Sequence, residues 1–230
     1  MTHKPTGASL MHGRQAARLE WLRGALGGLI GIGLTALICH RLLGSDPALP
    51  WLIAPMGAST VLLFAVPASP FAQPWPVFGG HLVSAAIALL LRGSLSDPAL
   101  AIALAVGLAI AAMSLLDCLH PPAGGTAVLM TLSSPAIDAA GWRFLAMPIA
   151  LNLVLLLAAA VVFHRLTGHT YPHRAAPRLS PGPATAPYEA ADIEAVLDDW
   201  DEVVSIERDD LDALMRAVLE RAEVRKAKGG

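Results

Sequence analysis

The chain has 230 residues, of which 55% are hydrophobic and only 15% are charged, and its formal net charge is −2. Together with a mean hydropathy of +0.57, this composition argues against an ordinary soluble domain and indicates an integral membrane protein. Charge is divided unevenly, because residues 1–188 carry ten Lys or Arg against five Asp or Glu, whereas residues 189–230 carry six against thirteen. We therefore expect a weakly basic membrane part, a strongly acidic tail and no nucleic-acid partner.

The first 20 residues are polar and basic and lack an apolar run that ends at a small-residue cleavage site. We expect a cytoplasmic N-terminal segment over residues 1–20, no cleavable signal peptide, and a transmembrane domain over residues 21–168. Six apolar segments in that domain approach the length that crosses about 30 Å of hydrocarbon. They are Leu22–Leu43, Trp51–Val66, Val77–Leu91, Ala99–Leu116, Pro121–Leu132 and Trp142–Phe163.

The first, fourth and sixth segments resemble ordinary spanning helices, whereas the other three are short and carry Pro or Gly at their starts. Either all six segments cross the membrane, or some of the short ones are half-helices that are entered through an extended stretch shielded by protein. Lys and Arg gather before the first segment and after the last. This charge distribution predicts a multi-pass protein with both termini in the cytoplasm, which requires an even number of crossings.

An internal repeat links the two halves of this domain. Pro55–Leu62 reappears 67 residues later as Pro122–Leu129, with four of the eight positions identical. Chance recurrence in an Ala-, Gly- and Leu-rich chain is the alternative explanation, but the flanking apolar segments repeat at the same offset. Three crossings per half would insert the second half upside down. We therefore predict an all-α helical bundle of two inverted repeats with broken short helices, which would hold substrate near the membrane midplane.

Both copies of the repeat have the features of a helix that starts inside the membrane. Proline at the first helical position removes no hydrogen bond. Glycine leaves backbone N–H groups uncovered, so the two helix starts are predicted to bind a small anion. The predicted pathway residues are Pro55, Gly57, Ala58 and Ser59 in the first copy and Pro121, Pro122, Gly124, Gly125 and Thr126 in the second. Close packing of helices through small residues is the alternative, and both explanations can hold together.

Two histidines, His81 and His120, lie beside these Pro and Gly elements and are the candidates to gate the pathway or relay a proton. Structural hydrogen bonding across a helix interface is the alternative role for each. Asp117, three residues before His120, either shares a helix face with it or lies in a loop. Gln73 is an accessory candidate for an entry path. Asn152 is expected to form an interhelical hydrogen bond, and a position facing the pathway is the alternative that makes it an accessory candidate.

The sequence shows no pattern that is typical of a metal site or an enzyme. Cys39 and Cys118 have neither metal-ligand nor redox spacing and are interpreted as buried free thiols. Asp117, Cys118 and His120 are too few and too poorly spaced for zinc. Because nucleophile, phosphate-binding and dinucleotide motifs are also lacking, we expect no metal, no cofactor and no enzymatic activity.

The acidic tail is predicted to be a separate helical part. A Pro-rich stretch over residues 169–188 indicates an extended linker. In residues 189–230, two groups of apolar positions recur at helical spacing, with Asp209 or Asp210 as the expected N-cap of the second helix. About forty residues hardly form a stable core alone, so we expect docking on the membrane domain or on another subunit, as in a homodimer. A solvated regulatory tail is the alternative.

At several motifs the chain resembles the HPP family of integral membrane proteins, which is named for the tripeptide found here at residues 120–122. The resemblance covers roughly residues 20–170 and includes Pro55–Ser59, motifs within Ser69–Pro74, Gly80–His81 and His120–Gly124. It implies a compact polytopic protein, although many members are described as having four membrane helices. Plant-plastid and cyanobacterial relatives are associated with nitrite transport. Some bacterial relatives carry CBS nucleotide-binding modules, and the acidic tail resembles the spacer seen in such proteins.

These observations, with the resemblance, predict an inner-membrane permease or channel for a small monovalent anion, with nitrite as the leading candidate and the lipid bilayer as its surroundings. The alternative is a non-transporting membrane scaffold or sensor whose acidic cytoplasmic tail recruits a partner protein. Loss of His120 should impair the permease, whereas removal of residues 189–230 should impair the scaffold.

Overall fold

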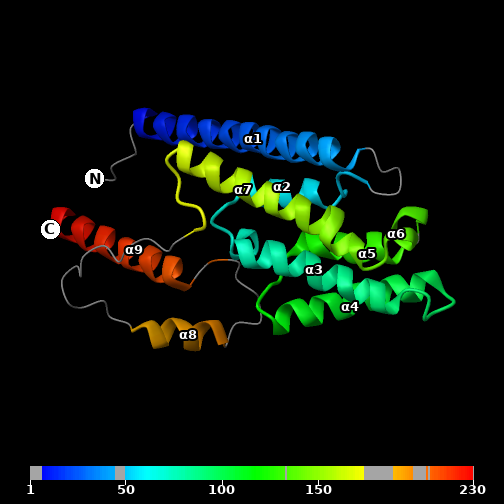
Figure 1. Cartoon of the computed structure of the whole chain (residues 1–230). Helices are drawn as coiled ribbons and strands as arrows, with labels where there is room; N and C mark the ends of the chain where they lie inside the picture. The colour runs from blue at the N-terminus through cyan, green and yellow to red at the C-terminus, as the bar shows by residue number, and fades with distance from the viewer. Residues whose placement is uncertain are drawn as a thin grey trace. The chain divides into compact units, whose positions relative to one another are not determined.

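The computed structural model describes residues 7–44, 50–132, 134–173, 189–198, 206 and 208–229. Helices are the only regular secondary structure in these ranges, which confirms the predicted all-α fold. The chain divides into two compact units, Met1–Pro172 and His173–Gly230. The first unit holds the helices labelled α1 to α7 in Figure 1, and the second holds α8 and α9.

Proline and short polar side chains set the helix starts of the first unit. Helices α3 to α6 each have Pro in the first turn, where its fixed φ suits a helix and its missing N–H removes no bond. The Asp97 and Ser134 side chains accept backbone N–H groups at the starts of α4 and α6. The bounds are α1 Gly7–Leu43, α2 Met56–Ala65, η1 Pro70–Ala72, α3 Pro74–Leu91, α4 Pro98–Leu115, α5 Pro121–Thr131, α6 Pro135–Ala140, η2 Leu145–Ala150 and α7 Leu151–Leu166.

Four helices among the described residues are long and apolar enough to cross a membrane. They are Glu20–Leu43 of α1, Pro74–Leu91, Pro98–Leu115 and Leu145–Leu166. The third predicted segment was expected to be short, but this was wrong, because α3 begins three residues earlier than the segment and has 18 residues. The sequence Pro74-Trp75-Pro76 looks like a loop, whereas both prolines lie in the first turn, where proline is tolerated.

The two remaining segments form half-length helices. Helix α2 has 10 residues and α5 has 11. At 1.5 Å per residue, a helix of about this length covers roughly half of a 30 Å hydrocarbon layer. Each is entered through a short non-helical stretch, residues 50–55 for α2 and residues 116–120 for α5. Of the two predicted topologies, the structure therefore has the one with half-helices.

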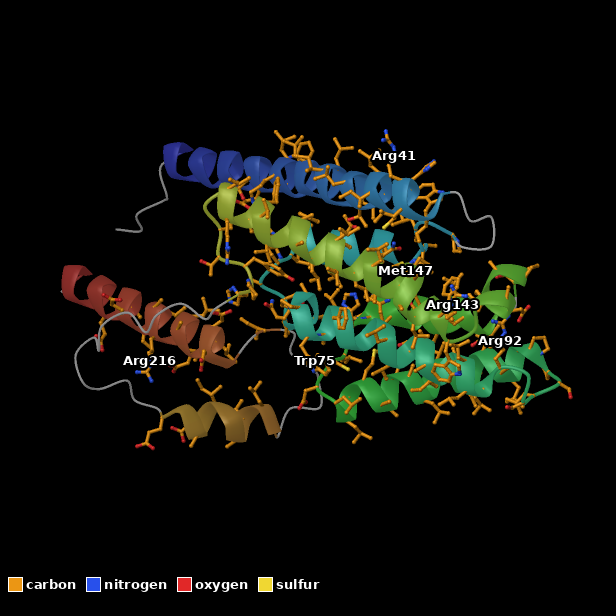
Figure 2. The ribbon with its side chains drawn as sticks, in the orientation of Figure 1. Arg41, Trp75, Arg92, Arg143, Met147 and Arg216 are labelled. Atoms are coloured by element: carbon orange, nitrogen blue, oxygen red, sulfur yellow. The ribbon has the colours of Figure 1, made fainter. Side chains whose placement is uncertain are left out.

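The chain nevertheless runs back along the unit at each half-helix. Figure 1 shows α1 ending at the right and α3 beginning at the left, so the intervening residues return through α2. Likewise, α4 ends at the left and α7 runs from right to left, so the chain returns through α5. The start of α1 and the end of α7 lie at the same end of the unit. Arg41, Arg92 and Arg143 lie toward the opposite end (Figure 2).

Helix packing follows the internal repeat. Helix α1 packs against α2 and α7, and in the second half α4 packs against α5 and α3. Exchanging α1 with α4, α2 with α5 and α3 with α7 converts the first set of contacts into the second. The exchange also pairs the α3–α5 contact with the α2–α7 contact, although the former is the more extensive. This pattern is the one expected of two inverted halves of three elements each.

The second unit consists of α8 (Ala190–Asp198) and α9 (Arg208–Gly229), so the predicted helical tail is present. Asp209 and Asp210 lie in the first turn of α9 rather than at its N-cap. Within this unit, His173 Nε2 lies 2.8 Å from the Asp210 carboxylate. Most of the predicted linker, residues 174–188, lies outside the described residues.

Candidate functional site

The first turns of the two half-helices lie side by side and antiparallel. A Cβ on Gly125 of α5 would lie 3.5 Å from Pro55 Cγ, at the start of α2. One turn away, Ser59 of α2 contacts His120, the N-cap residue of α5. His120 has an extended backbone, φ −135° and ψ 103°, so the chain enters α5 directly from a strand-like stretch. Two predicted pathway segments, 67 residues apart in the sequence, therefore meet in one place.

Four buried polar side chains connect these helix starts, and we call Thr126, His81, Ser59 and His120 the polar row. His81 Nδ1 lies 2.6 Å from Thr126 Oγ1, and His81 Nε2 lies 2.9 Å from Ser59 Oγ. Ser59 Oγ also lies 2.9 Å from His120 Nε2. At the far end, His120 Nδ1 lies 2.8 Å from the Phe71 carbonyl oxygen. All four side chains are fully buried, so the polar row is a continuous hydrogen-bonded chain inside the membrane unit.

The end groups assign a single donor direction to the polar row when both rings are neutral. A carbonyl oxygen only accepts, so His120 Nδ1 carries the proton and donates to Phe71. His120 Nε2 then accepts from the Ser59 hydroxyl, and Ser59 Oγ accepts from His81 Nε2–H. His81 Nδ1 is left to accept from the Thr126 hydroxyl. Every nitrogen of both rings is thereby satisfied.

His81 joins equivalent positions of the repeat. Ser59 and Thr126 are separated by the repeat offset of 67 residues, and their hydroxyls bind opposite nitrogens of the same ring. The position equivalent to His81 in the second half is Pro148. The polar row is therefore asymmetric, with one histidine shared between two related helix starts.

Glycines leave the outer side of both helix starts open. A Cβ on Gly57 or on Gly124 would meet no atom within 4 Å. These two residues are also equivalent in the repeat. An open apolar groove of about 290 Å³ between α1 and α2 is lined in part by Gly57 and Thr60. The polar row thus lies on the inner side of the helix starts and accessible backbone lies on the outer side.

The other predicted pathway residues surround the polar row without joining it. Pro121 begins α5 and Ala58 lies in the first turn of α2, and both are exposed, whereas Pro122 is half-buried. Asp117 lies in the turn after α4 with φ 51°, which is the loop position rather than the shared helix face. Gln73 precedes α3, and its Nε2 donates to the carbonyls of residues 67 and 69, so it holds that connection.

Asn152 forms the interhelical hydrogen bonds expected of it. Its Oδ1 accepts from Ile53 N–H at 3.0 Å, and its Nδ2 donates to the Trp51 carbonyl at 3.0 Å and to Cys39 Sγ at 3.1 Å. The amide thereby pairs with one backbone N–H and one backbone carbonyl of the extended stretch that precedes α2. Asn152 therefore holds the stretch that leads into α2, and its hydrogen bonds are with residues outside the polar row.

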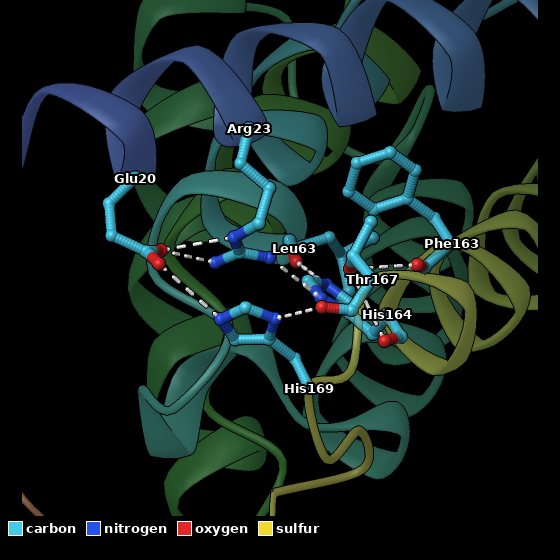
Figure 3. Close-up of polar contacts among 7 residues, drawn as sticks. All are labelled: Glu20, Arg23, Leu63, Phe163, His164, Thr167 and His169. Atoms are coloured by element: carbon cyan, nitrogen blue, oxygen red, sulfur yellow. Dashed lines mark hydrogen bonds and ion pairs between the residues drawn. The ribbon is translucent and has the colours of Figure 1, made fainter. Parts of the chain in front are cut away.

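A second polar cluster lies where α1 begins its apolar part and α7 ends (Figure 3). His164 Nε2 donates to the Leu63 carbonyl at 2.8 Å, and Arg23 Nη1 lies 3.2 Å from His164 Nδ1. Arg23 also pairs with Glu20 at 2.9 Å. Because Arg only donates, the neutral His164 ring is the acceptor. Sequence reasoning missed this cluster, although a histidine in an apolar helix and the Glu20/Arg23 spacing were visible signals.

Tyr171 is a buried residue at the C-terminal end of the membrane unit, and it lies beside that cluster. Its ring lies 5.2 Å from the His164 ring, and its hydroxyl donates to the Ala72 carbonyl at 2.7 Å. Burial raises the pKa of the Tyr171 phenol, so the hydroxyl keeps its proton and remains a donor. This bond fixes the connection next to Phe71, whose carbonyl ends the polar row.

Comparisons with known proteins match the same part of the chain. A family model described as the HPP transmembrane region matches residues 14–172. Two proteins of Dictyostelium discoideum, both described as transmembrane proteins, are 34% and 36% identical over 152 residues. The alignments cover 64% of this chain but only 48% and 53% of those proteins, so the chain spans about half of their length. No solved structure matches significantly. Because the family match includes the polar row and most of the chain, the chain belongs to the HPP family of membrane proteins.

Proposed function

We propose that the chain is a permease or channel for a small monovalent anion, with nitrite as the first substrate to test, and that it is not an enzyme. In this proposal it lies in the inner membrane with both termini in the cytoplasm. The observation that carries the proposal is the meeting of the α2 and α5 helix starts. Each helix start presents the positive end of a helix dipole, and two together favour an anion.

Access to the backbone supports a ligand at this place. Gly57 and Gly124 have open space where a side chain would stand, so a small ion can approach the first turns of both helices. Gly57 also lies at the apolar groove between α1 and α2. If Gly57 and Gly124 served helix packing alone, each would face a neighbouring helix. Instead, a Cβ added at either position would meet no atom within 4 Å.

The test replaces Gly124 by Val and measures anion uptake into proteoliposomes, with nitrite compared with chloride and nitrate. A Cβ at position 124 would meet no atom within 4 Å, and the valine side chain would cover the helix start. We therefore expect saturable nitrite uptake to fall by about tenfold or more while the protein stays folded. Gly107→Val is the matched control, because Gly107 is also unobstructed but lies in α4. Equal uptake by wild type and Gly124→Val would contradict the proposed site, and no uptake above empty liposomes would contradict the function.

A scaffold function is the second candidate, because α9 exposes several apolar side chains. Leu214, Met215 and Val218 are 54%, 43% and 56% exposed, at spacings of one helix face. Such a face suits docking on a partner protein. In this alternative the tail recruits the partner and the membrane unit is an anchor, so uptake assays would show no flux for any small anion.

A further inference from the structure

We propose that the anion is accompanied by a proton, which the polar row delivers to His120 while the anion occupies the starts of α2 and α5. This inference rests on the proposed function, since it names how the same site is coupled. Ser59 is the central residue, because its hydroxyl is the link between the two imidazoles. Among the hydrogen bonds of the described residues, none joins the two rings directly, and each ring uses its Nε2 to bond Ser59.

The donor direction of the polar row makes the transfer a balanced series of steps. A proton from the aqueous phase binds His81 Nδ1 as the Thr126 hydroxyl turns to accept. The His81 Nε2–H bond then breaks while a new O–H bond forms on Ser59, and the original Ser59 O–H bond breaks while an Nε2–H bond forms on His120. His81 ends neutral and His120 ends as an imidazolium that still donates to Phe71. Release of that proton, exchange of His81 from its Nδ1–H tautomer back to its Nε2–H tautomer, and rotation of the hydroxyls restore the starting state.

The surroundings of His120 explain why its protonation depends on a bound anion. Helices α2, α3, α4 and α5 contain no Asp, Glu, Lys or Arg. Among the hydrogen bonds and ion pairs of the described residues, neither imidazole meets a carboxylate. Two further titratable groups lie within three residues of His120 in the sequence. They are Asp117, in the turn after α4, and Cys118, which is buried against Gly79. A protonated His120 therefore has no fixed counter-ion in the polar row.

The helix starts supply the second half of the coupling. His120 is the N-cap of α5, where a helix dipole disfavours a positive charge and favours a negative one. A lone anion at this depth is also unfavourable, because few polar groups solvate it away from water. The imidazolium and the anion neutralise each other, so each ion stabilises the binding of the other. Binding of one without the other is the disfavoured state, which is the condition for coupled movement.

The experiment measures nitrite uptake and internal pH together in proteoliposomes, with empty liposomes subtracted. We expect wild type to move about one proton with each anion, as a neutral pair requires. In Ser59→Ala and Thr126→Val, proton movement should slow by about 100-fold, the low end of the effect of losing a proton-transfer group, and more than anion movement does. The protons moved per anion should therefore drop. Ser59→Thr, which keeps the hydroxyl, should restore the ratio.

Matched controls separate coupling from packing. Ser114→Ala and Thr131→Val remove hydroxyls that only bond to carbonyls one turn back in α4 and α5, so the ratio should stay at the wild-type value. A purely structural role of Ser59 would slow both fluxes and leave the ratio unchanged, which would overturn the inference. Nitrite uptake without proton uptake in wild type would overturn it while leaving the permease proposal standing. Absence of all anion uptake would overturn both.

Discussion

Gly80 is the residue at which α3 comes closest to the start of α5. A Cβ there would lie 2.9 Å from the Cys118 carbonyl oxygen and 2.9 Å from His120 Cβ. At 2.9 Å there is no room for a Cβ unless the backbone shifts. Glycine at position 80 therefore allows His81 and His120 both to contact Ser59. At the scale of single residues, the hydrogen bonds of the polar row therefore depend on Gly80, although Gly80 has no side chain to take part in them.

We expect Gly80→Ala to destabilise the membrane unit by about 1–3 kcal/mol, as overpacking of a tight core does. The two backbones must separate, which should also lengthen the hydrogen bonds of the polar row. Thermal unfolding in detergent measures the effect, and Gly107→Ala in α4, where a Cβ meets nothing within 4 Å, is the control. An unfolding temperature of Gly80→Ala that equals that of Gly107→Ala would show that α3 and the α5 start are not in close contact.

At the scale of elements, the half-helix α2 depends on an anchor in α7. The stretch before α2 has backbone groups that no helix satisfies, and at membrane depth each unsatisfied group is costly. Asn152 pairs with two of them, the Trp51 carbonyl and the Ile53 N–H. The position of Asn152 among apolar residues of the last segment indicated a hydrogen bond across a helix interface, but the identity of its partners depended on the fold.

Asn152→Leu should cost about 2–5 kcal/mol of unfolding free energy, because it leaves the buried Ile53 N–H and the part-buried Trp51 carbonyl without their partner. The loss should fall mainly on α2, so anion uptake should decline with stability. Measuring both in the same preparation checks this, and Val154→Leu, at a 54% exposed position of α7, provides the control. Unfolding at the wild-type temperature would mean that the stretch before α2 is held by other contacts.

At the scale of the whole molecule, the membrane unit and the tail are separate compact units. The first contains the helix starts, the polar row and the cluster around His164, and the second contains α8 and α9. Since each predicted pathway residue lies in the first unit, the proposed transport and the alternative of partner recruitment by the tail belong to different parts of the chain. This separation allows the two candidate functions to be distinguished with one deletion.

Removal of residues 189–230 should leave anion uptake per protein within about twofold of the full chain, because substitutions and deletions remote from a site usually have small effects on it. The scaffold alternative predicts instead that this deletion abolishes the function in cells while His120→Ala has no effect. Uptake assays and growth assays on the same two variants decide between them. Complete loss of uptake from a folded, tail-deleted protein would mean that the tail is part of the transport unit.

Local sequence patterns were sufficient for much of this architecture. Apolar length, the positions of Pro and Gly, and the 67-residue repeat predicted a helical membrane unit in which Pro55–Ser59 and Pro122–Thr126 start two short helices. These features act over one or two helical turns, so the chain itself carries them. The error at α3 has the same origin, because prolines in a first turn and prolines in a loop look alike in sequence.

Only the tertiary structure decided which of the predicted residues act together. His81 and His120 were each identified from a neighbouring Pro or Gly, yet nothing in the sequence indicates that Ser59 lies between them. The acceptor that orients the polar row, the Phe71 carbonyl, carries no side-chain signal at all. Hydrogen bonds across α2, α3 and α5 join residues far apart in the chain, and their geometry is set by helix packing rather than by local periodicity. The sequence by itself therefore determined the kind of elements and the kinds of side chain at their starts, and packing decided the order of the polar row and its direction.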